Sequence, residues 1–246
     1  LLPRDLPEVE GADVAVFMKT ATEVGGDYYD FQVDDAGLTV AIGDATGHGA
    51  RAGTMVTVIK SLFAARAAQN RPDAFLAEAS EVIRSMRLER MTMALALLRF
   101  ERKEAGGWSL VLSSAAMPPV VVHRGDGGLE EVTLQGLPLG AMAEASYDVR
   151  RLDLEDGDCV LLMSDGLPEL PSPVGEVYGY SRVHERLRTM AGRGPRLTIE
   201  RLAQEVESWT EGRPPADDVT FVVVKIASAE SRRDEAAASP SHARAD

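Results

Sequence analysis

DYYDFQVDDAGLTVAIGDA, residues 27–45, reads as two β-strands joined by a tight turn at residues 34–37. If Asp34 pairs with Gly37, the hairpin register places Asp27 directly opposite Asp44, on the same face of the sheet. Asp30 then points to the other face, because side chains alternate along a strand. A bulged three-residue loop would instead pair Asp27 with Ala45 and separate the two carboxylates. Two ionised carboxylates about 5 Å apart repel by roughly 3 kcal/mol at an effective dielectric constant of about 20. The favoured register therefore predicts a cation between them, or a protonated acid.

The rest of the chain alternates strand and helix patterns without an internal repeat. Strands are predicted near residues 12–18, 27–33, 38–42, 92–100, 108–114, 119–123, 129–133, 158–163 and 218–226. Helices are predicted near residues 50–69, 73–88, 181–191 and 199–210. Most neighbouring strands are joined by short turns, which force antiparallel pairing. The fold class is α+β, with largely antiparallel sheets covered by helices.

Composition excludes several classes of protein. The 246 residues have a net charge of −13, which disfavours binding to nucleic acid and argues against a nuclease or phosphodiesterase. No apolar stretch approaches the ~20 residues of a membrane span, and no signal peptide opens the sequence. The single cysteine, Cys159, lies in an apolar run and reads as a core residue. A cytoplasmic location is the expectation.

Two further strands place acids at their ends. Asp165 follows the apolar run at 159–163, as Asp44 follows its strand, and Asp217-Asp218 precedes the run at 219–224. In antiparallel neighbours the end of one strand lies beside the start of the next, so these acids are expected to gather at one edge. Clustered carboxylate oxygens suit Mg²⁺ or Mn²⁺, and bridging carboxylates suit two such ions.

Five motifs together resemble one enzyme family. They are EVGGDYYDF (23–31), IGDATGHGARA (42–52), LQGLPLG (134–140), DGDCVLLMSDGLPE (156–169) and ADDVTFVVV (216–224). The chain resembles the metal-dependent protein serine/threonine phosphatases of the protein phosphatase 2C (PP2C) type, in the bacterial SpoIIE/RsbU-like branch. This resemblance implies two packed antiparallel sheets flanked by helices, an αββα sandwich. It also implies two Mn²⁺ or Mg²⁺ ions and hydrolysis of phosphoserine or phosphothreonine by a metal-activated water.

The resemblance also implies site residues. Asp27, Asp44, Asp165 and Asp217 correspond to metal ligands, with Asp44 bridging the ions and the carbonyl of Ala45 adding an oxygen. No side-chain nucleophile is required.

Three departures from the family pattern affect candidate residues. Eukaryotic relatives have a histidine two residues after the bridging Asp, whereas His48 lies four residues after Asp44, so their general-acid role does not transfer to it. His48 stays a candidate catalytic residue, with shaping of the glycine turn as its alternative role. Lys19 stands where a proline is frequent, and is a candidate phosphate contact or a solvated charge. SSAAMPP (113–119) replaces the Asn-Ala-Gly-His-Pro-Pro of many members.

The expected organisation is a linker at 1–10, a phosphatase domain at 11–227 and a disordered tail at 228–246. The expected partners are a phosphorylated protein substrate, in this family an anti-sigma-factor antagonist, and an N-terminal regulatory domain outside this sequence. A homodimer is a further hypothesis. The alternative function is a catalytically silent metal-binding regulatory module with the same fold.

Overall fold

The computed structural model describes residues 2–67, 71–88, 91–190 and 194–227, which form ten strands and four helices. The strands are β1 (Ala12–Lys19), β2 (Asp27–Asp34), β3 (Gly37–Ala45), β4 (Met93–Arg102), β5 (Trp108–Ala115), β6 (Val120–His123), β7 (Leu129–Val132), β8 (Arg150–Leu154), β9 (Cys159–Met163) and β10 (Val219–Ile226). The helices are α1 (Ala50–Arg66), α2 (Pro72–Ser85), α3 (Tyr180–Met190) and α4 (Pro195–Trp209). The tail predicted at 228–246 lies outside the described residues.

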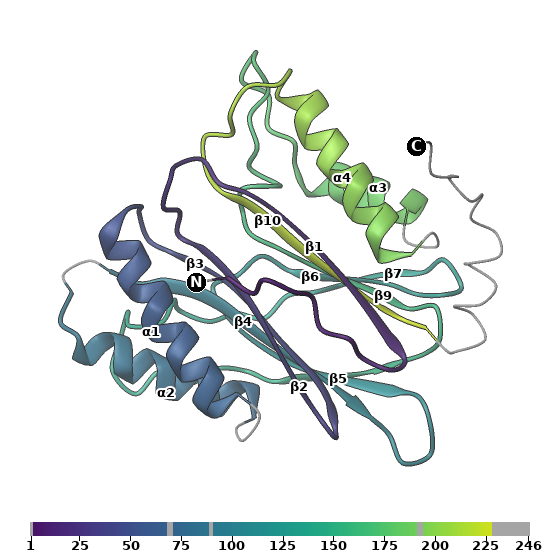
Figure 1. Cartoon of the computed structure of the whole chain (residues 1–246), viewed down its shortest axis with the longest axis horizontal. Coiled ribbons are helices and arrows are strands. Elements are labelled where there is room, and N and C mark those ends of the chain that lie inside the picture. Colours follow the sequence, from purple (N-terminus) through teal and green to yellow (C-terminus); the bar gives the residue numbers. More distant parts are fainter. Residues whose placement is uncertain (1, 68–70, 89–90, 191–193, 228–246) are drawn as a thin grey trace, which may run out of the picture.

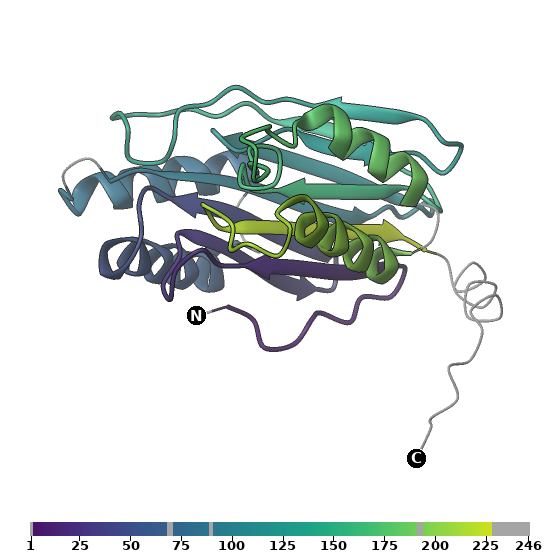
Figure 2. The same cartoon turned by 90° about the horizontal axis from the view of Figure 1, so that it is seen from above.

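The strands form two five-stranded antiparallel sheets. One has the order β1-β10-β9-β6-β7 and the other β2-β3-β4-β5-β8. In Figure 1, α1 and α2 lie at one side of the molecule and α3 and α4 at the other, with the strands between them. Figure 2 shows the same layers from above. The predicted αββα sandwich is confirmed.

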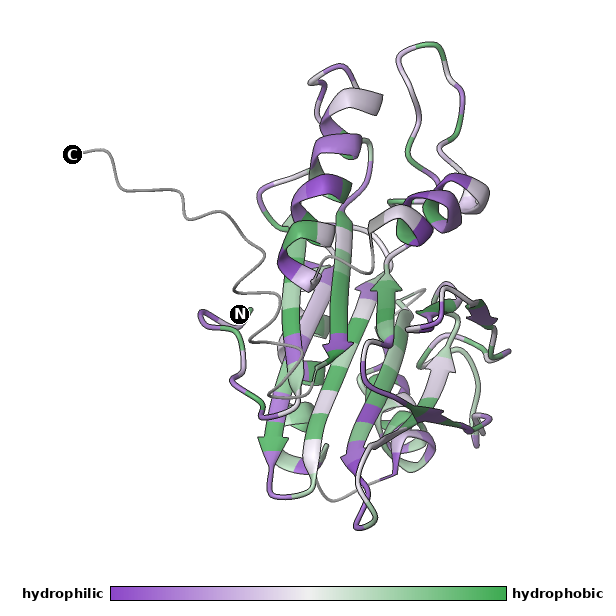
Figure 3. Cartoon of the chain, turned by 90° about the vertical axis from the view of Figure 1, so that its right-hand side faces the viewer, coloured by the Kyte–Doolittle hydropathy of each residue, from purple (hydrophilic) through white to green (hydrophobic). Residues whose placement is uncertain are grey.

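Alternating side chains divide the interior into three cores. Leu38, Val40 and Ile42 of β3 face the other sheet, whereas Ala41 and Ala45 face α1 and α2. In the other sheet, Val222 and Val224 of β10 face inward and Phe221 and Val223 face α3 and α4. Figure 3 shows the consequence: the central strands are predominantly hydrophobic, and hydrophilic residues are concentrated on the helices and loops.

Strand β8 is absent from the sequence prediction. It joins the edge of its sheet by pairing with β5, and only Leu152 and Leu154 of its residues are buried. The other residues of the strand are charged and exposed, so the segment lacks the apolar run that marked the other strands. Helix α4 starts at Pro195, four residues before its predicted start at 199, because a proline fits the first turn of a helix.

The N-terminal segment predicted to be a linker contacts the domain. Val9 is buried in the core between the sheets, and Leu2 packs against that core and the α1–α2 core. The guanidinium of Arg102 donates to the backbone carbonyl of Glu10 over 2.7 Å. None of the helices in the described part of the chain has the length and apolar character needed to cross a membrane.

Candidate metal centre

The β2–β3 hairpin has the predicted register. Asp34 pairs with Gly37 and Asp27 pairs with Asp44, so the alternative bulged register is wrong. Asp27 shares a face with Tyr29, and Asp44 shares a face with Ile42, so both carboxylates face the gap between the sheets. Asp30 faces α1, where Lys60 donates to its carboxylate over 2.7 Å, as expected from the alternation.

The second pair of acids lies on the facing sheet. Met163 at the end of β9 pairs with Phe221 of β10, so Asp165 and Asp217 lie just beyond the same end of these two strands. Ser164 continues the inward-facing series of β9, and its hydroxyl donates to the Asp27 carboxylate of the other sheet over 2.8 Å. The two sheets therefore meet at the edge where the four acids lie.

Asp217 and Asp218 have different surroundings, as adjacent strand-end residues should. Asp218 is buried, and its carboxylate oxygens accept the backbone N–H groups of Ala21 (2.8 Å) and Asp27 (3.3 Å). Asp217 is exposed and lines a hollow together with Asp165. The structure thus leaves Asp217 accessible to a ligand and uses Asp218 to hold the loop before β2.

Burial and mutual repulsion raise the pKa values of three of these carboxyl groups. Burial, together with the charge of Asp44, raises the pKa of Asp27 to about 8. Burial, then the charges of Asp165 and Asp217, raise the pKa of Asp44 to about 7. Burial, then the charges of Glu169 and Asp217, raise the pKa of Asp165. The acids are therefore close enough to disfavour one another's charged forms.

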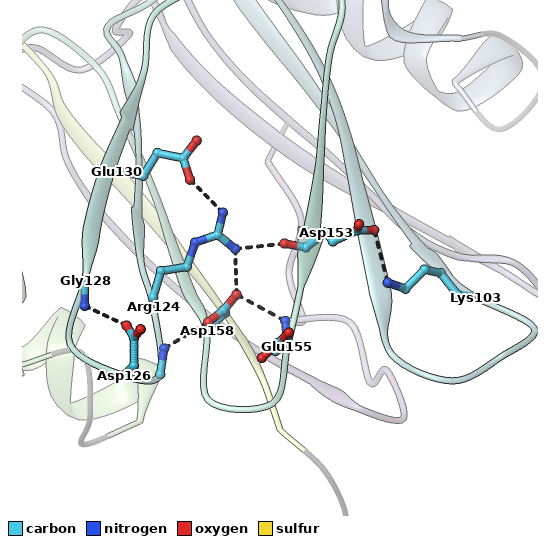
Figure 4. Close-up of polar contacts among 9 residues, drawn as sticks. Lys103, Arg124, Asp126, Gly128, Glu130, Asp153, Glu155 and Asp158 are labelled. Atoms are coloured by element: carbon cyan, nitrogen blue, oxygen red, sulfur yellow. Dashed lines mark hydrogen bonds and ion pairs between the residues drawn. The ribbon is translucent and has the colours of Figure 1, made fainter.

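The described part of the chain places no cation against these four carboxylates. Among the residues that the structure describes, no Lys, Arg or His lies within ion-pair distance of Asp27, Asp44, Asp165 or Asp217. The opposite end of β9 provides a contrast (Figure 4). There the Arg124 guanidinium contacts the carboxylates of Asp158 (2.8 Å) and Glu130 (2.6 Å), and Asp158 also accepts two backbone N–H groups. Of these two ends of β9, the one near Asp44 has no positive partner among the described residues.

Three oxygen atoms approach Gly26 closely at the acidic edge. A Cβ atom placed on Gly26 would lie 2.3 Å from the carbonyl oxygen of Ala45, 2.6 Å from Asp44 Oδ1 and 3.1 Å from the carbonyl oxygen of Gly47. Carboxylate and carbonyl oxygens are the ligands of hard divalent cations. Within the described ranges, no three His, Cys, Asp or Glu side chains form a ready-made ion-binding group. The match between this edge and a divalent cation therefore rests on the oxygen donors and on the carboxylate charge that no described Lys, Arg or His neutralises.

His48 and Lys19, the two other candidate site residues, make no contact with the four acids in the described structure. His48 is exposed in the loop between β3 and α1. Lys19 ends β1, and its ammonium group donates to Glu207 of α4 over 2.8 Å. The loop at 116–119 does reach the site, because it lines a hollow that also contains Asp44 and Asp165.

Sequence reasoning missed the positioning residues Ser164 and Asp218. Both continue the inward-facing alternation of their strands, Ser164 after Val160 and Leu162, and Asp218 before Thr220 and Val222. This period-two pattern was the available signal. The pattern did not predict that both residues form hydrogen bonds with Asp27 of the other sheet, because the spacing of residues along one strand does not determine contacts between sheets.

Two known proteins are similar to this chain in sequence. Protein IcfG of Synechocystis sp. is 22% identical over 249 residues, which cover 91% of this chain and 39% of that protein. Phosphoserine phosphatase RsbU of Bacillus subtilis is 26% identical over 174 residues, covering 69% of this chain and 50% of RsbU. The chain therefore spans half or less of the length of these relatives.

Solved structures share the fold. The SiaA-PP2C domain of Pseudomonas aeruginosa superposes with a TM-score of 0.73 at 23% identity, covering 86% of this chain and 84% of that one. The catalytic domain of the serine/threonine phosphatase PstP, in complex with two manganese ions, superposes with a TM-score of 0.65 at 18% identity, covering 89% and 99%. These similarities show that the chain has the fold of PP2C-type phosphatase domains.

The family follows from the sequence. The family model for Stage II sporulation protein E (SpoIIE) matches residues 34–227, most of the chain. This chain belongs to the SpoIIE family.

Proposed function

We propose that this chain hydrolyses phosphoserine or phosphothreonine on a protein substrate, using two divalent ions, Mn²⁺ or Mg²⁺, bound at the acidic edge. The observation that supports this most is the meeting of Asp27 and Asp44 from one sheet with Asp165 and Asp217 from the other, with no Lys, Arg or His of residues 2–67, 71–88, 91–190 and 194–227 in ion-pair contact with them. PstP, a structural neighbour, is described with two manganese ions, and RsbX, another neighbour, with magnesium.

The proposed ligands are Asp27, Asp44, Asp165, Asp217 and the carbonyl oxygen of Ala45. Asp44 is the proposed bridging ligand, since its pKa responds to both Asp165 and Asp217 and it pairs with Asp27. Divalent ions in such a site supply a hydroxide nucleophile at neutral pH and neutralise the phosphate oxygens. The protein's part is to hold its carboxylates in fixed positions and to leave one side of the site open to substrate.

The finer biological role rests on the family resemblance. The proposed substrate is a phosphorylated anti-sigma-factor antagonist, and the proposed setting is cytoplasmic signalling under an N-terminal regulatory domain, with a homodimer as one form. RsbU, the relative named above as a phosphoserine phosphatase, supports the choice of phosphoserine.

Release of phosphate from a phosphoserine peptide tests the proposal. We expect release with Mn²⁺ and none with excess chelator, with activity restored when Mn²⁺ is added back. Full turnover in chelator would overturn the metal mechanism. Mn²⁺ binding without turnover of any phosphoprotein would instead favour the silent regulatory module.

Ser164→Ala is expected to weaken Mn²⁺ binding about 10-fold, because it removes the hydroxyl that donates to the Asp27 carboxylate. Loss of a residue that orients a metal ligand typically lowers metal affinity about 10–100-fold. Isothermal titration calorimetry of the metal-free protein measures this directly.

Ser113→Ala is the matched control. Ser113 of β5 is also buried, and its hydroxyl donates over 2.7 Å to the backbone carbonyl of Asp148, in the loop before β8. It should lose a comparable hydrogen bond without losing Mn²⁺ affinity. Equal affinities in the two variants would show that Ser164 does not position Asp27 for metal.

A further inference from the structure

A hollow of about 270 Å³ adjoins the acidic edge. One side of it consists of three carboxylates, and the other of small, apolar and aromatic residues. The acidic side is formed by Asp44, Asp165 and Glu169, and the other side by Ala94, Ala116, Met117, Pro118, Pro119 and Tyr180.

The apolar side is continuous with the candidate metal centre. Ala94 pairs with Asp44 across the β3–β4 ladder, so the apolar surface begins at the neighbouring residue of the same sheet. A phosphate held at the acidic edge would therefore bring the groups attached to it towards this wall.

The wall is fixed in shape before any ligand arrives. Ala116 has a φ of 63°, a left-handed conformation that costs an alanine of order 1 kcal/mol and persists only where its surroundings enforce it. Met117 is buried and packs in the core between the sheets, and the two prolines that follow it have restricted backbones. Strained and rigid loop residues of this kind are typical of functional sites.

The negative charge of Glu169 at the edge of the hollow affects which substrate side chains can enter it. Glu169 is exposed beside Asp165, and Tyr180, which is 38% exposed, also lines the hollow. Burial, and then the charges of Glu169 and Asp165, raise the pKa of the Tyr180 hydroxyl, which places this ring beside the carboxylates. With the proposed ions bound to Asp44 and Asp165, the carboxylate of Glu169 is left to repel an acidic side chain that enters the hollow. An apolar side chain would instead contact Met117, Pro118 and Tyr180.

We propose that this hollow receives an apolar side chain adjacent in sequence to the phosphorylated residue of the substrate, and that it rejects an acidic one. The inference rests on the proposed phosphatase function and specifies its substrate class: a phosphoserine or phosphothreonine flanked by an apolar residue. Residues 116–119, the second half of the SSAAMPP segment that departs from the usual family sequence, supply most of the wall that would make this selection.

Phosphoserine peptides that differ only in the residue next to phosphoserine test the inference. With Leu, Ala or Glu placed directly before or directly after the phosphoserine, we expect kcat/KM for the better Leu peptide to exceed that of the corresponding Glu peptide about 10-fold or more. Tyr180→Ala should reduce the Leu-to-Ala ratio about threefold or more, because it removes one side of the hollow while the residue is exposed enough for the fold to tolerate the change. Glu169→Gln should raise the relative turnover of the Glu peptide.

Val33→Ala is the matched control. Val33 is an exposed apolar residue near the hairpin turn, at the far end of β2 from Asp27, and its replacement should leave every selectivity ratio unchanged. Wild-type turnover of p-nitrophenyl phosphate, which has no flanking residue, tests the proposed function separately. Absence of that turnover would reject the phosphatase assignment. Turnover with equal rates for Leu and Glu peptides, or ratios unaffected by Tyr180→Ala, would reject the flanking-residue site alone.

Discussion

Asp44→Asn is expected to abolish phosphatase activity and, at the same time, to raise the melting temperature of the metal-free protein at pH 8. Activity should fall by about 10³-fold or more, because the variant removes the charge at the centre of the acidic edge. Stability should rise because the ionised carboxylate is partly buried and faces Asp165 and Asp217. We expect the free energy of unfolding to rise by about 2 kcal/mol, a figure reduced because Asp44 is partly exposed to solvent. For a domain of this size, that change raises the melting temperature by roughly 4–8 °C.

The pH dependence follows from the direction of the pKa shift. The folded-state pKa of Asp44, about 7, lies above its ordinary value of 3.8, so the folded state binds the proton more tightly. The loss of folding stability caused by the Asp44 carboxylate is absent below about pH 4, where the group is protonated in both states. It grows as the pH rises and is complete above about pH 7. The stability difference between Asp44→Asn and wild type should therefore vanish near pH 4 and be largest at pH 8.

The matched control for this variant is Asp35→Asn, at an exposed turn of the same hairpin. It should change neither activity nor melting temperature. Excess Mn²⁺ should reverse the order of the Asp44→Asn and wild-type melting temperatures, since only wild type gains stability from bound ions. A metal-free Asp44→Asn protein that is less stable than wild type at pH 8 would contradict the electrostatic account.

Gly26→Ala is expected to lower kcat/KM about 10²-fold by displacing the oxygens proposed to hold the ions. The new Cβ would lie 2.3 Å from the carbonyl oxygen of Ala45 and 2.6 Å from Asp44 Oδ1, closer than real Cβ contacts allow. The strand ends must therefore separate, and Mn²⁺ affinity should fall with activity. Calorimetric Mn²⁺ titration and phosphate release together measure the effect.

Gly53→Ala is the control for this glycine substitution. Gly53 lies in α1, where an added Cβ would make an ordinary 3.4 Å contact with Val24. Replacing a helix-interior glycine with alanine stabilises a helix by about 1 kcal/mol, so this variant should keep full Mn²⁺ affinity and melt no lower than wild type. Unchanged Mn²⁺ affinity in Gly26→Ala would show that the ions do not bind beside Gly26.

The sequence predicted local structure well where turn chemistry and alternation act together. Gly37 and the acids before it fixed the hairpin register, and this register placed Asp27 opposite Asp44. The ends of β9 and β10 were likewise predictable from the apolar runs next to Asp165 and Asp217.

The sequence could not predict contacts between the two sheets. The hydrogen bond from Ser164 to Asp27 joins residues 137 positions apart. The hydrogen bonds that Asp218 accepts from Ala21 and Asp27 join residues 197 and 191 positions apart. Strand β8 was missed because charged residues alternate with only two buried leucines at a sheet edge. In each case tertiary packing, rather than local propensity, determines the structure.

Anomalous diffraction from crystals grown with Mn²⁺ tests the central claim most directly. The account predicts two manganese peaks at the edge where the sheets meet, coordinated by Asp44 and by oxygens of Asp27, Ala45, Asp165 and Asp217. Manganese bound elsewhere on the protein, or no peak at this edge in crystals of active enzyme, would contradict it.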